Sequence, residues 1–270
     1  MSNKDYFKME SKIYKNCTSI EDKFKMFATY LLKQFKLKIG DAICSIEEVE
    51  IYYNSADHKD EYTHKNKDQL TNSMWYFHQY QNGSYKNGTY RGMDITFGNG
   101  KDIYGGALIR SISNTTDNEF VMGPCNTVNY ILKKTGCAEI ADLVKKMKNL
   151  EVLNEKNPYY LTIQPTQDAN ICIFTGPRVG LSLKYPEYLI KEYRYLKQPS
   201  KISKCRSTII SSLHNGGMKE TDICKLTKLS TSSVKKAIKE FDDAEELEED
   251  EVLALKPDKI NKIYGYYAKN

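Results

Sequence analysis

Glu50, Tyr52 and His64 are the residues whose types and spacing best suit chemistry on a ligand. Apolar and polar residues alternate over 42–53, which predicts a strand, and residues two apart in a strand point to the same face. Glu50 would therefore lie beside the ring of Tyr52. A carboxylate, a phenol and an imidazole near an aromatic surface are suitable for binding a flat heterocycle and activating water.

Simpler interpretations fit the same residues. Glu47 and Glu48 stand next to Glu50, and acidic residues on an edge strand are more often solvated than catalytic. A single histidine such as His64 more often lies at the surface or completes a hydrogen bond. His78 alternates with aromatic residues in WYFHQY and is a further candidate, which either lines the same cleft or caps the core.

We expect neither a metal ion nor a cofactor. Asp57, His58, Asp60 and His64 fall within one predicted loop, but without the regular geometry of a metal site. The glycine-rich segment 90–106 has neither a P-loop nor a dinucleotide fingerprint, and hairpin turns explain it better.

The cysteines and the hydropathy pattern predict an intracellular protein. The seven cysteines are scattered and form no CxxC pair, which argues against a disulfide scaffold. The first twelve residues lack the apolar stretch of a secretory signal, and no apolar run is long enough to span a bilayer. We therefore expect no membrane association, and a location in the nucleus if the source is eukaryotic or in the cytoplasm otherwise.

Periodicity and composition predict a mixed helix-and-strand domain over residues 1–198 and a second domain over 199–270. The sequence QPSK at the junction reads as a linker. The elements expected in the first domain are a helical region at 1–40, a strand at 42–53, a loop at 54–72, glycine-broken strands at 74–112, a helical region at 126–153 and strands at 160–183.

The segment 204–241 resembles a helix-turn-helix, because its apolar residues are spaced to bury one face of two short helices. Ser230 or Thr231 would cap the second helix, and Lys228 stands where glycine is usual and would have to accept a strained φ. A helical bundle used for packing or dimerisation fits the same pattern. The residues expected to face outward, toward DNA phosphates and base edges, are Ser232, Ser233, Lys235, Lys236 and Lys239.

The charge of the chain is unevenly distributed. Eight of the ten residues at 242–251 are acidic, so the rest of the chain carries +13, compared with +5 for the whole. A body this basic favours a polyanionic partner, either nucleic acid or an anionic membrane surface. The acidic segment reads as a solvated helix surface or linker, or as an autoinhibitory mimic of DNA. The tail after it would form a wing or a docking segment.

An ordered series of short motifs covers roughly residues 25–196. This series resembles the alkyladenine (3-methyladenine) DNA glycosylase family, the single-domain type. The resemblance implies an α+β fold with a mixed, largely antiparallel curved sheet and packed helices. The motifs, in order, are LLKQ, EVEIYY, DEYTH, TNSMWYF, YRGM, GGALIRSI, MGPCN, GPRVGL and YRYL.

The resemblance implies a role for each matching residue. Glu50 matches the carboxylate that activates the attacking water, Tyr52 a ring that stacks on the extruded base, and His64 the histidine that contacts it. Arg110 and Arg178 match arginines at strand ends, which would anchor the fold or contact phosphate.

This sequence departs from the family pattern at the residue that is wedged into the DNA stack. Arg91 occupies the place of the family's wedge tyrosine, unless the neighbouring Tyr90 takes that role. The family's second pocket tyrosine has no clear counterpart, which predicts an altered set of accepted bases.

The resulting hypothesis is a monofunctional DNA N-glycosylase for base-excision repair or modified-base processing. It would bind duplex DNA, flip out and excise an alkylated or otherwise modified base, and leave an abasic site without a cofactor. The alternative is a non-catalytic DNA-binding protein that reads a modified base through the same pocket.

Overall fold

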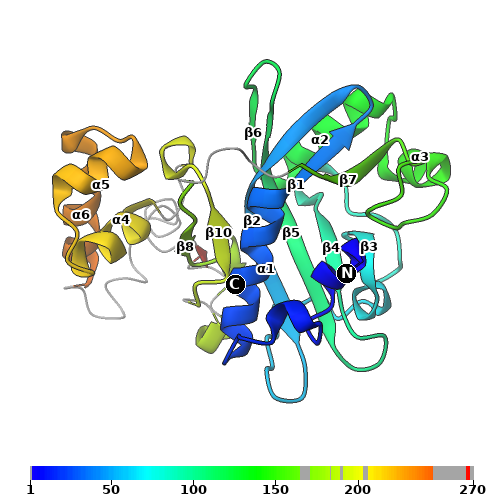
Figure 1. Cartoon of the computed structure of the whole chain (residues 1–270), viewed down its shortest axis with the longest axis horizontal. Helices are drawn as coiled ribbons and strands as arrows, with labels where there is room; N and C mark the ends of the chain where they lie inside the picture. The colour runs from blue at the N-terminus through cyan, green and yellow to red at the C-terminus, as the bar shows by residue number, and fades with distance from the viewer. Residues whose placement is uncertain are drawn as a thin grey trace. The chain divides into compact units, whose positions relative to one another are not determined.

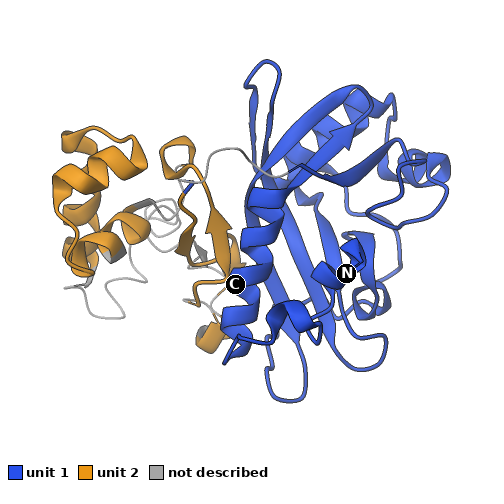
Figure 2. Ribbon diagram, in the orientation of Figure 1, with its two compact units in different colours: residues 1–171 blue, residues 172–270 orange. Residues whose placement is uncertain are grey.

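The chain forms two compact units, residues 1–171 and 172–270 (Figure 2). The computed structural model describes residues 2–164, 171–182, 184–188, 191–202, 206–245 and 266–267. The division at 171/172 precedes the expected boundary at 198/199. Phe174 and Leu196 share an apolar cluster with Ile202 and Ile209, which groups these strand residues with the helices that follow them.

The first unit is built on a large antiparallel sheet (Figure 1). Its strand order is β3-β4-β5-β2-β1-β7, and β6 pairs with β5. This architecture confirms the expected α+β class with a largely antiparallel sheet. The strands are β1 (Phe35–Ile39), β2 (Ala42–Asn54), β3 (Asn72–Phe77), β4 (Met93–Phe97), β5 (Tyr104–Asn114), β6 (Phe120–Met122) and β7 (Tyr159–Ile163).

Three α-helices accompany this sheet: α1 (Ile20–Gln34), α2 (Pro124–Thr135) and α3 (Ile140–Lys146). A capping box formed by Ser19 and Asp22 starts α1. Gly136, in the left-handed conformation, ends α2. Short 3-10 turns occupy Asn3–Phe7, Lys12–Tyr14, Lys67–Leu70 and Gly88–Tyr90.

Two of the expected helical regions are shorter than predicted. Residues 35–39 form the strand β1, in which Phe35, Leu37 and Ile39 are buried and alternate with two lysines. This alternation was not recognised because it directly follows residues with the spacing of a helix. Residues 147–153 are not helical either. The side chain of Asn157 accepts from the backbone N–H of Lys148 and donates to the carbonyl of Asn149, which holds this segment in an irregular path.

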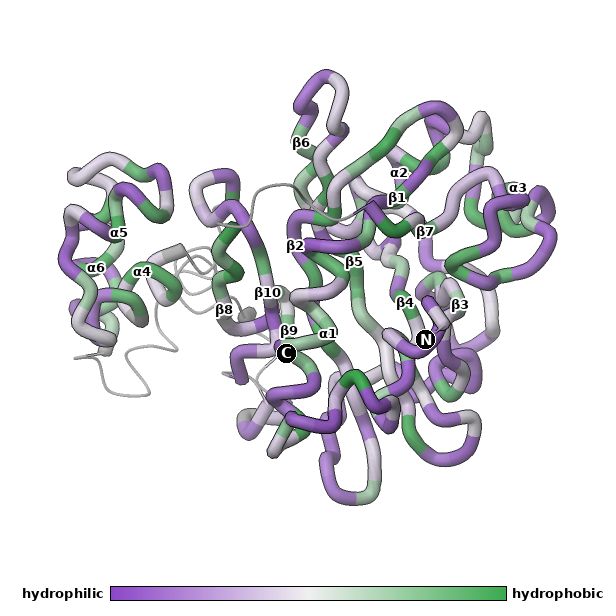
Figure 3. Tube along the Cα trace, in the orientation of Figure 1, coloured by the Kyte–Doolittle hydropathy of each residue, from purple (hydrophilic) through white to green (hydrophobic). Residues whose placement is uncertain are grey.

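The two faces of the sheet differ in polarity. Residues paired across neighbouring strands form a row whose side chains point to the same face. One row runs Glu50–Leu108–Asp94–Tyr76 across β2, β5, β4 and β3. The opposite face is apolar and packs against α1, where the ring of Phe24 lies 5.2 Å from that of Tyr53. In Figure 3, green apolar stretches alternate with purple polar stretches along the chain.

The described residues of the second unit form three α-helices and short strands. Its helices are α4 (Arg206–Asn215), α5 (Glu220–Thr227) and α6 (Thr231–Glu245), with 3-10 turns at Pro186–Tyr188 and Pro199–Lys201. The helices bury Ile210, Ile223, Val234, Ala237 and Ile238. Antiparallel β8 (Phe174–Gly176) and β10 (Arg194–Leu196), and parallel β9 (Leu181–Ser182) and β11 (Tyr266–Tyr267), form two strand pairs.

The turn between α5 and α6 has the conformation that its sequence predicts. Lys228 has φ 57°, and the Ser230 hydroxyl accepts from the Ser233 N–H, 3.2 Å away. Residues 242–245 of the acidic segment belong to α6, whereas 246–251 and nearly all of the tail lie outside the described residues. Among the helices that the structure describes, none is long and apolar enough to cross a membrane.

Candidate functional site

Glu50 lies at the centre of the sheet and is completely buried. Its strand, β2, is paired on both sides, by β1 and β5. Tyr52 donates from its hydroxyl to Oε2 of Glu50 over 3.0 Å, and Arg110 donates from Nη1 to the same oxygen over 3.2 Å. The structure thus confirms that Glu50 and Tyr52 share one face of β2, and it adds Arg110 to them.

Arg110 is held between two carboxylates. Its Nε donates to Oε1 of Glu48 over 3.1 Å, and Ser111 donates from its hydroxyl to the other oxygen of Glu48. Burial alone would lower the pKa of the Arg110 guanidinium, but the charges of Glu50 and Glu48 outweigh it and raise that pKa above its usual value. Arg110 is therefore a permanent cation beside Glu50.

Two register shifts in the β2–β5 pair create this arrangement. Glu47 is the extra residue on β2 between the pairs Ile46–Ile112 and Glu48–Ser111, and Arg110 is the extra residue on β5 before Val49–Ile109. Bulges commonly re-aim side chains near functional sites. The interpretation of these carboxylates as solvated edge residues is wrong, because β2 is an interior strand and Glu47, Glu48 and Glu50 are all buried.

His64 and His78 form a second polar cluster around Asp94. Nε2 of His78 lies 2.8 Å from Oδ1 of Asp94, and Gln69 donates to the other carboxylate oxygen over 3.1 Å. The rings of His64 and His78 meet edge to face at 4.5 Å, and Nδ1 of His64 lies 3.2 Å from the hydroxyl of Tyr76. The structure therefore brings both predicted histidines together.

The protonation states in this cluster follow from its packing. Burial, and then the neighbouring His78, lower the pKa of His64 to about 4, although His64 as a whole residue is exposed. Burial, and then the charge of Asp94, raise the pKa of Tyr76. Tyr76 therefore keeps its proton, and the hydrogen bond between its hydroxyl and Nδ1 of His64 joins two neutral groups.

The cluster around Glu50 and the cluster around Asp94 share the polar face of the sheet. None of the hydrogen bonds and ion pairs described above for these residues joins the two clusters. Glu50 and Tyr76 are three strands apart in one row, a separation of about 14 Å at about 4.8 Å per strand. Leu108 and Asp94 occupy the row between them.

Tyr90 and Arg91 have different environments. Tyr90 is 70% exposed at the end of the 3-10 turn Gly88–Tyr90. Arg91 donates from Nη1 to Oδ1 of Asn129 on α2 over 2.6 Å. Of the two residues, Tyr90 presents a ring to solvent, whereas Arg91 is tied to a helix.

Arg178 belongs to the second unit, where it is fully buried. Its guanidinium lies over the ring of Tyr193 at 5.5 Å, and Nη2 donates to the carbonyl of Tyr188 over 3.4 Å. These contacts show that Arg178 anchors the fold of the second unit, which was one of its two expected roles; the other was contact with phosphate.

The predicted DNA-facing residues of α6 lie along one exposed side of the helix. Ser232, Lys235, Lys236 and Lys239 are exposed, and Ser233 is half-buried. Lys239 pairs with Asp243 over 2.7 Å, and Lys235 lies 3.7 Å from Glu220.

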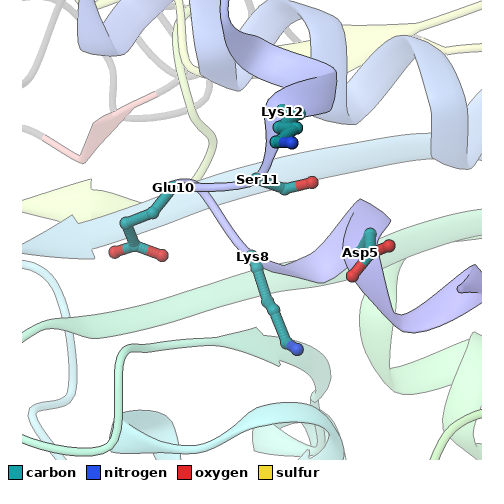
Figure 4. A pocket seen from close by; sticks show the side chains of 5 residues that line it. All are labelled: Asp5, Lys8, Glu10, Ser11 and Lys12. Carbon is teal, nitrogen blue, oxygen red and sulfur yellow. The ribbon is translucent and has the colours of Figure 1, made fainter. Parts of the chain in front are cut away.

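Described residues of the first unit line at least two surface cavities. One, of about 560 Å³, has His64 and Tyr76 among its lining residues. The other, of about 550 Å³, is lined entirely by the N-terminal segment, by the residues Asp5, Lys8, Glu10, Ser11 and Lys12 (Figure 4). Only the first cavity contains a residue predicted from the sequence.

Sequence reasoning missed Asp94, Gln69 and Tyr76. The available signal was Asp94 itself, because a lone carboxylate inside the apolar strand sequence MDITF has to be paired when it is buried. Gln69 gave no comparable signal. Within the described residues, no group of three histidines, cysteines or carboxylates could hold a metal ion.

No protein-family model matches the chain. A viral protein of Acanthamoeba polyphaga mimivirus, described as uncharacterized protein L759, is 33% identical over 201 residues. The alignment covers 70% of this chain and 92% of the viral protein. The chain belongs to the same family as the mimivirus uncharacterized protein L759.

Proposed function

We propose that the protein is a DNA N-glycosylase that extrudes a modified base from a duplex and hydrolyses its N-glycosyl bond. The observation that carries the proposal is the Glu50 carboxylate, which accepts hydrogen bonds from Tyr52 and Arg110 on the polar face of the sheet. The ordered motif series implies the same chemistry for Glu50.

Each residue around Glu50 has a defined task in this reaction. Glu50 accepts a proton from the water that attacks C1′ and stabilises the cationic sugar as the base departs. Arg110 holds the carboxylate in place through its hydrogen bond to Oε2. Tyr52 orients it and offers its ring to the extruded base. The product is an abasic site.

Base extrusion costs a few kcal/mol and is least costly at damaged or mispaired bases. Tyr90 is suited to fill the vacated stack, because its ring is exposed at the end of a short turn. Arg91 is less suited, because Asn129 already binds its guanidinium. His64 stands beside Tyr76, about 14 Å from Glu50 along the row, so it is placed to contact the strand next to the extruded base.

The second unit supports the proposal because α5, a short turn and α6 follow one another as the elements of a helix-turn-helix would. Lys235, Lys236 and Lys239 stand on the exposed side of α6, where a recognition helix neutralises phosphates. Lys236 is the most available of the three, since the other two have ion-pair partners within the unit.

A second candidate function is a reader that binds a modified base without cleaving it. The specific observation in its favour is that Glu50 has no exposed surface. Water reaches this carboxylate only if the surrounding side chains move.

Excision on duplexes that carry 3-methyladenine, 7-methylguanine, ethenoadenine, hypoxanthine or a naturally modified base tests both candidates. Hot alkali converts each abasic site into a strand break. We expect breaks with the native protein and none with Glu50→Gln, and the matched Glu155→Gln variant on an exposed loop should behave like the native protein.

The outcomes separate the candidates. Tight binding without breaks from any duplex supports the reader. Absent or salt-independent binding to every duplex contradicts both, because phosphate contacts make DNA affinity depend on salt.

A further inference from the structure

The cavity of about 560 Å³ beside His64 is positively charged and aromatic. None of its lining residues is acidic, although the buried carboxylate of Asp94 lies nearby. Its wall is formed by residues of the segment between β2 and β3, of β3 itself and of the hairpin after β3: His64, Lys65, Asn66, Lys67, Tyr76, Gln79, Tyr80, Gln81, Gly83 and Lys86.

The lysines of this cavity differ in availability. Lys65 forms an ion pair with Glu61, with 2.7 Å between Nζ and Oε2. Among the described residues, no ion pair engages Lys67 or Lys86. Lys86 is half-buried, and its backbone N–H donates to the carbonyl of His78, which fixes it in the hairpin beside the histidine cluster. Burial lowers the pKa of the Lys86 ammonium, which the nearby Asp94 partly opposes.

A ring and several amides accompany these two cations. Tyr80 is 41% exposed and is positioned by a hydrogen bond from its hydroxyl to Asn87 over 3.3 Å. Asn66 donates to the side chain of Gln79 over 3.3 Å, which links the loop to the hairpin. Ammonium groups that neutralise phosphate, next to a tyrosine face on which a base stacks, are the two components of single-strand nucleic-acid binding.

We propose that this cavity binds a phosphate and the adjoining base of a nucleotide about four positions along the strand from the one presented to Glu50. This subsite rests on the proposed DNA substrate. The spacing is compatible, since about 14 Å between Glu50 and Tyr76 corresponds to about four nucleotides at 3.4 Å per nucleotide. Lys86 and Lys67 contact phosphate, and Tyr80 stacks on the base.

Equilibrium binding of the full chain to a labelled duplex with two mismatched purines four nucleotides apart, measured over a salt series, tests the subsite. The variants are Lys86→Gln, Lys67→Gln and Tyr80→Ala. The matched control is Lys25→Gln on α1, the helix that packs on the opposite face of the sheet. We expect each lysine variant to weaken binding several-fold and to lower the salt slope by about 1. Tyr80→Ala should weaken binding about tenfold with an unchanged slope.

Lys86→Arg should restore the salt slope, because it keeps the charge. Unchanged affinity and slope in both Lys86→Gln and Lys67→Gln would overturn the subsite, and so would equal losses in Lys25→Gln. If Lys86-dependent binding is present without base excision, the subsite stands and the catalytic proposal fails.

Binding of free deoxynucleoside monophosphate and of inorganic phosphate is measured separately. Lys86-dependent binding of these as tight as that of the duplex would assign the cavity to a free nucleotide and overturn the strand contact.

Discussion

Arg110 lies within hydrogen-bonding distance of Glu50, with 3.2 Å between Nη1 and Oε2, and Arg110 is the extra residue of a bulge in β5. The same guanidinium binds Glu48, so one buried cation serves two buried carboxylates. Removing one partner of a buried ion pair leaves uncompensated charge, which costs far more than the pair contributes.

We therefore predict that Arg110→Met destabilises the first unit by about 3–5 kcal/mol. Urea unfolding followed by circular dichroism measures this change. The triple variant Glu48→Gln/Glu50→Gln/Arg110→Met should recover most of the loss, because it also removes both charges. A loss below about 1 kcal/mol in the single variant would show that water already solvates these carboxylates.

Stability should depend on pH through His64. Its folded pKa of about 4 lies below the value near 6.5 of an unfolded histidine, so between these values the unfolded state binds a proton that the folded state does not. The free energy of unfolding should therefore fall as the pH decreases from 6.5 to 4. Urea midpoints of the native protein and of His64→Asn, compared across this range, isolate the effect. Titration of His64 at or above 6.5, measured by NMR, would contradict it.

Gly106 should tolerate no side chain. A Cβ there would lie 2.5 Å from Oδ2 of Asp94 and 2.9 Å from Nε2 of Gln69. We expect Gly106→Ala to displace Asp94 from His78 and to cost about 1–3 kcal/mol, as overpacking does. The matched control is Gly176→Ala, where the nearest atom is Cγ1 of Ile209 at 3.1 Å. Thermal unfolding measures the loss of stability, and the His78 ring resonances report the displacement of Asp94. Equal losses of stability in both variants would contradict the proposed clash between the new side chain and Asp94.

Lys228 adopts a left-handed conformation that costs a non-glycine residue about 1 kcal/mol. Lys228→Gly should raise the stability of the helical unit by up to about 1 kcal/mol, as seen in its melting temperature. Lys225→Gly, inside α5, should instead lower stability by about 1 kcal/mol. Destabilisation by both glycines would mean that the turn is not strained.

Local patterns were sufficient to predict several elements. Alternation over 42–53 predicted β2 and the shared face of Glu50 and Tyr52, because side-chain direction in a strand depends only on residue parity. Lys228 and Ser230 predicted the turn before α6 for an equally local reason. In contrast, β1 was not predicted, since five alternating residues directly after a helix gave too short a signal.

The sequence by itself determined the α+β class, the strand that carries Glu50 and Tyr52, and the two-helix turn near the C-terminal end. These depend on periodicity and capping, which act between residues close in the chain. Only the tertiary structure decided that Arg110 pairs with Glu50, and that Asp94 binds His78 next to His64. Those pairs join residues 60 and 16 positions apart, and their geometry depends on strand order and bulges, which no local pattern encodes.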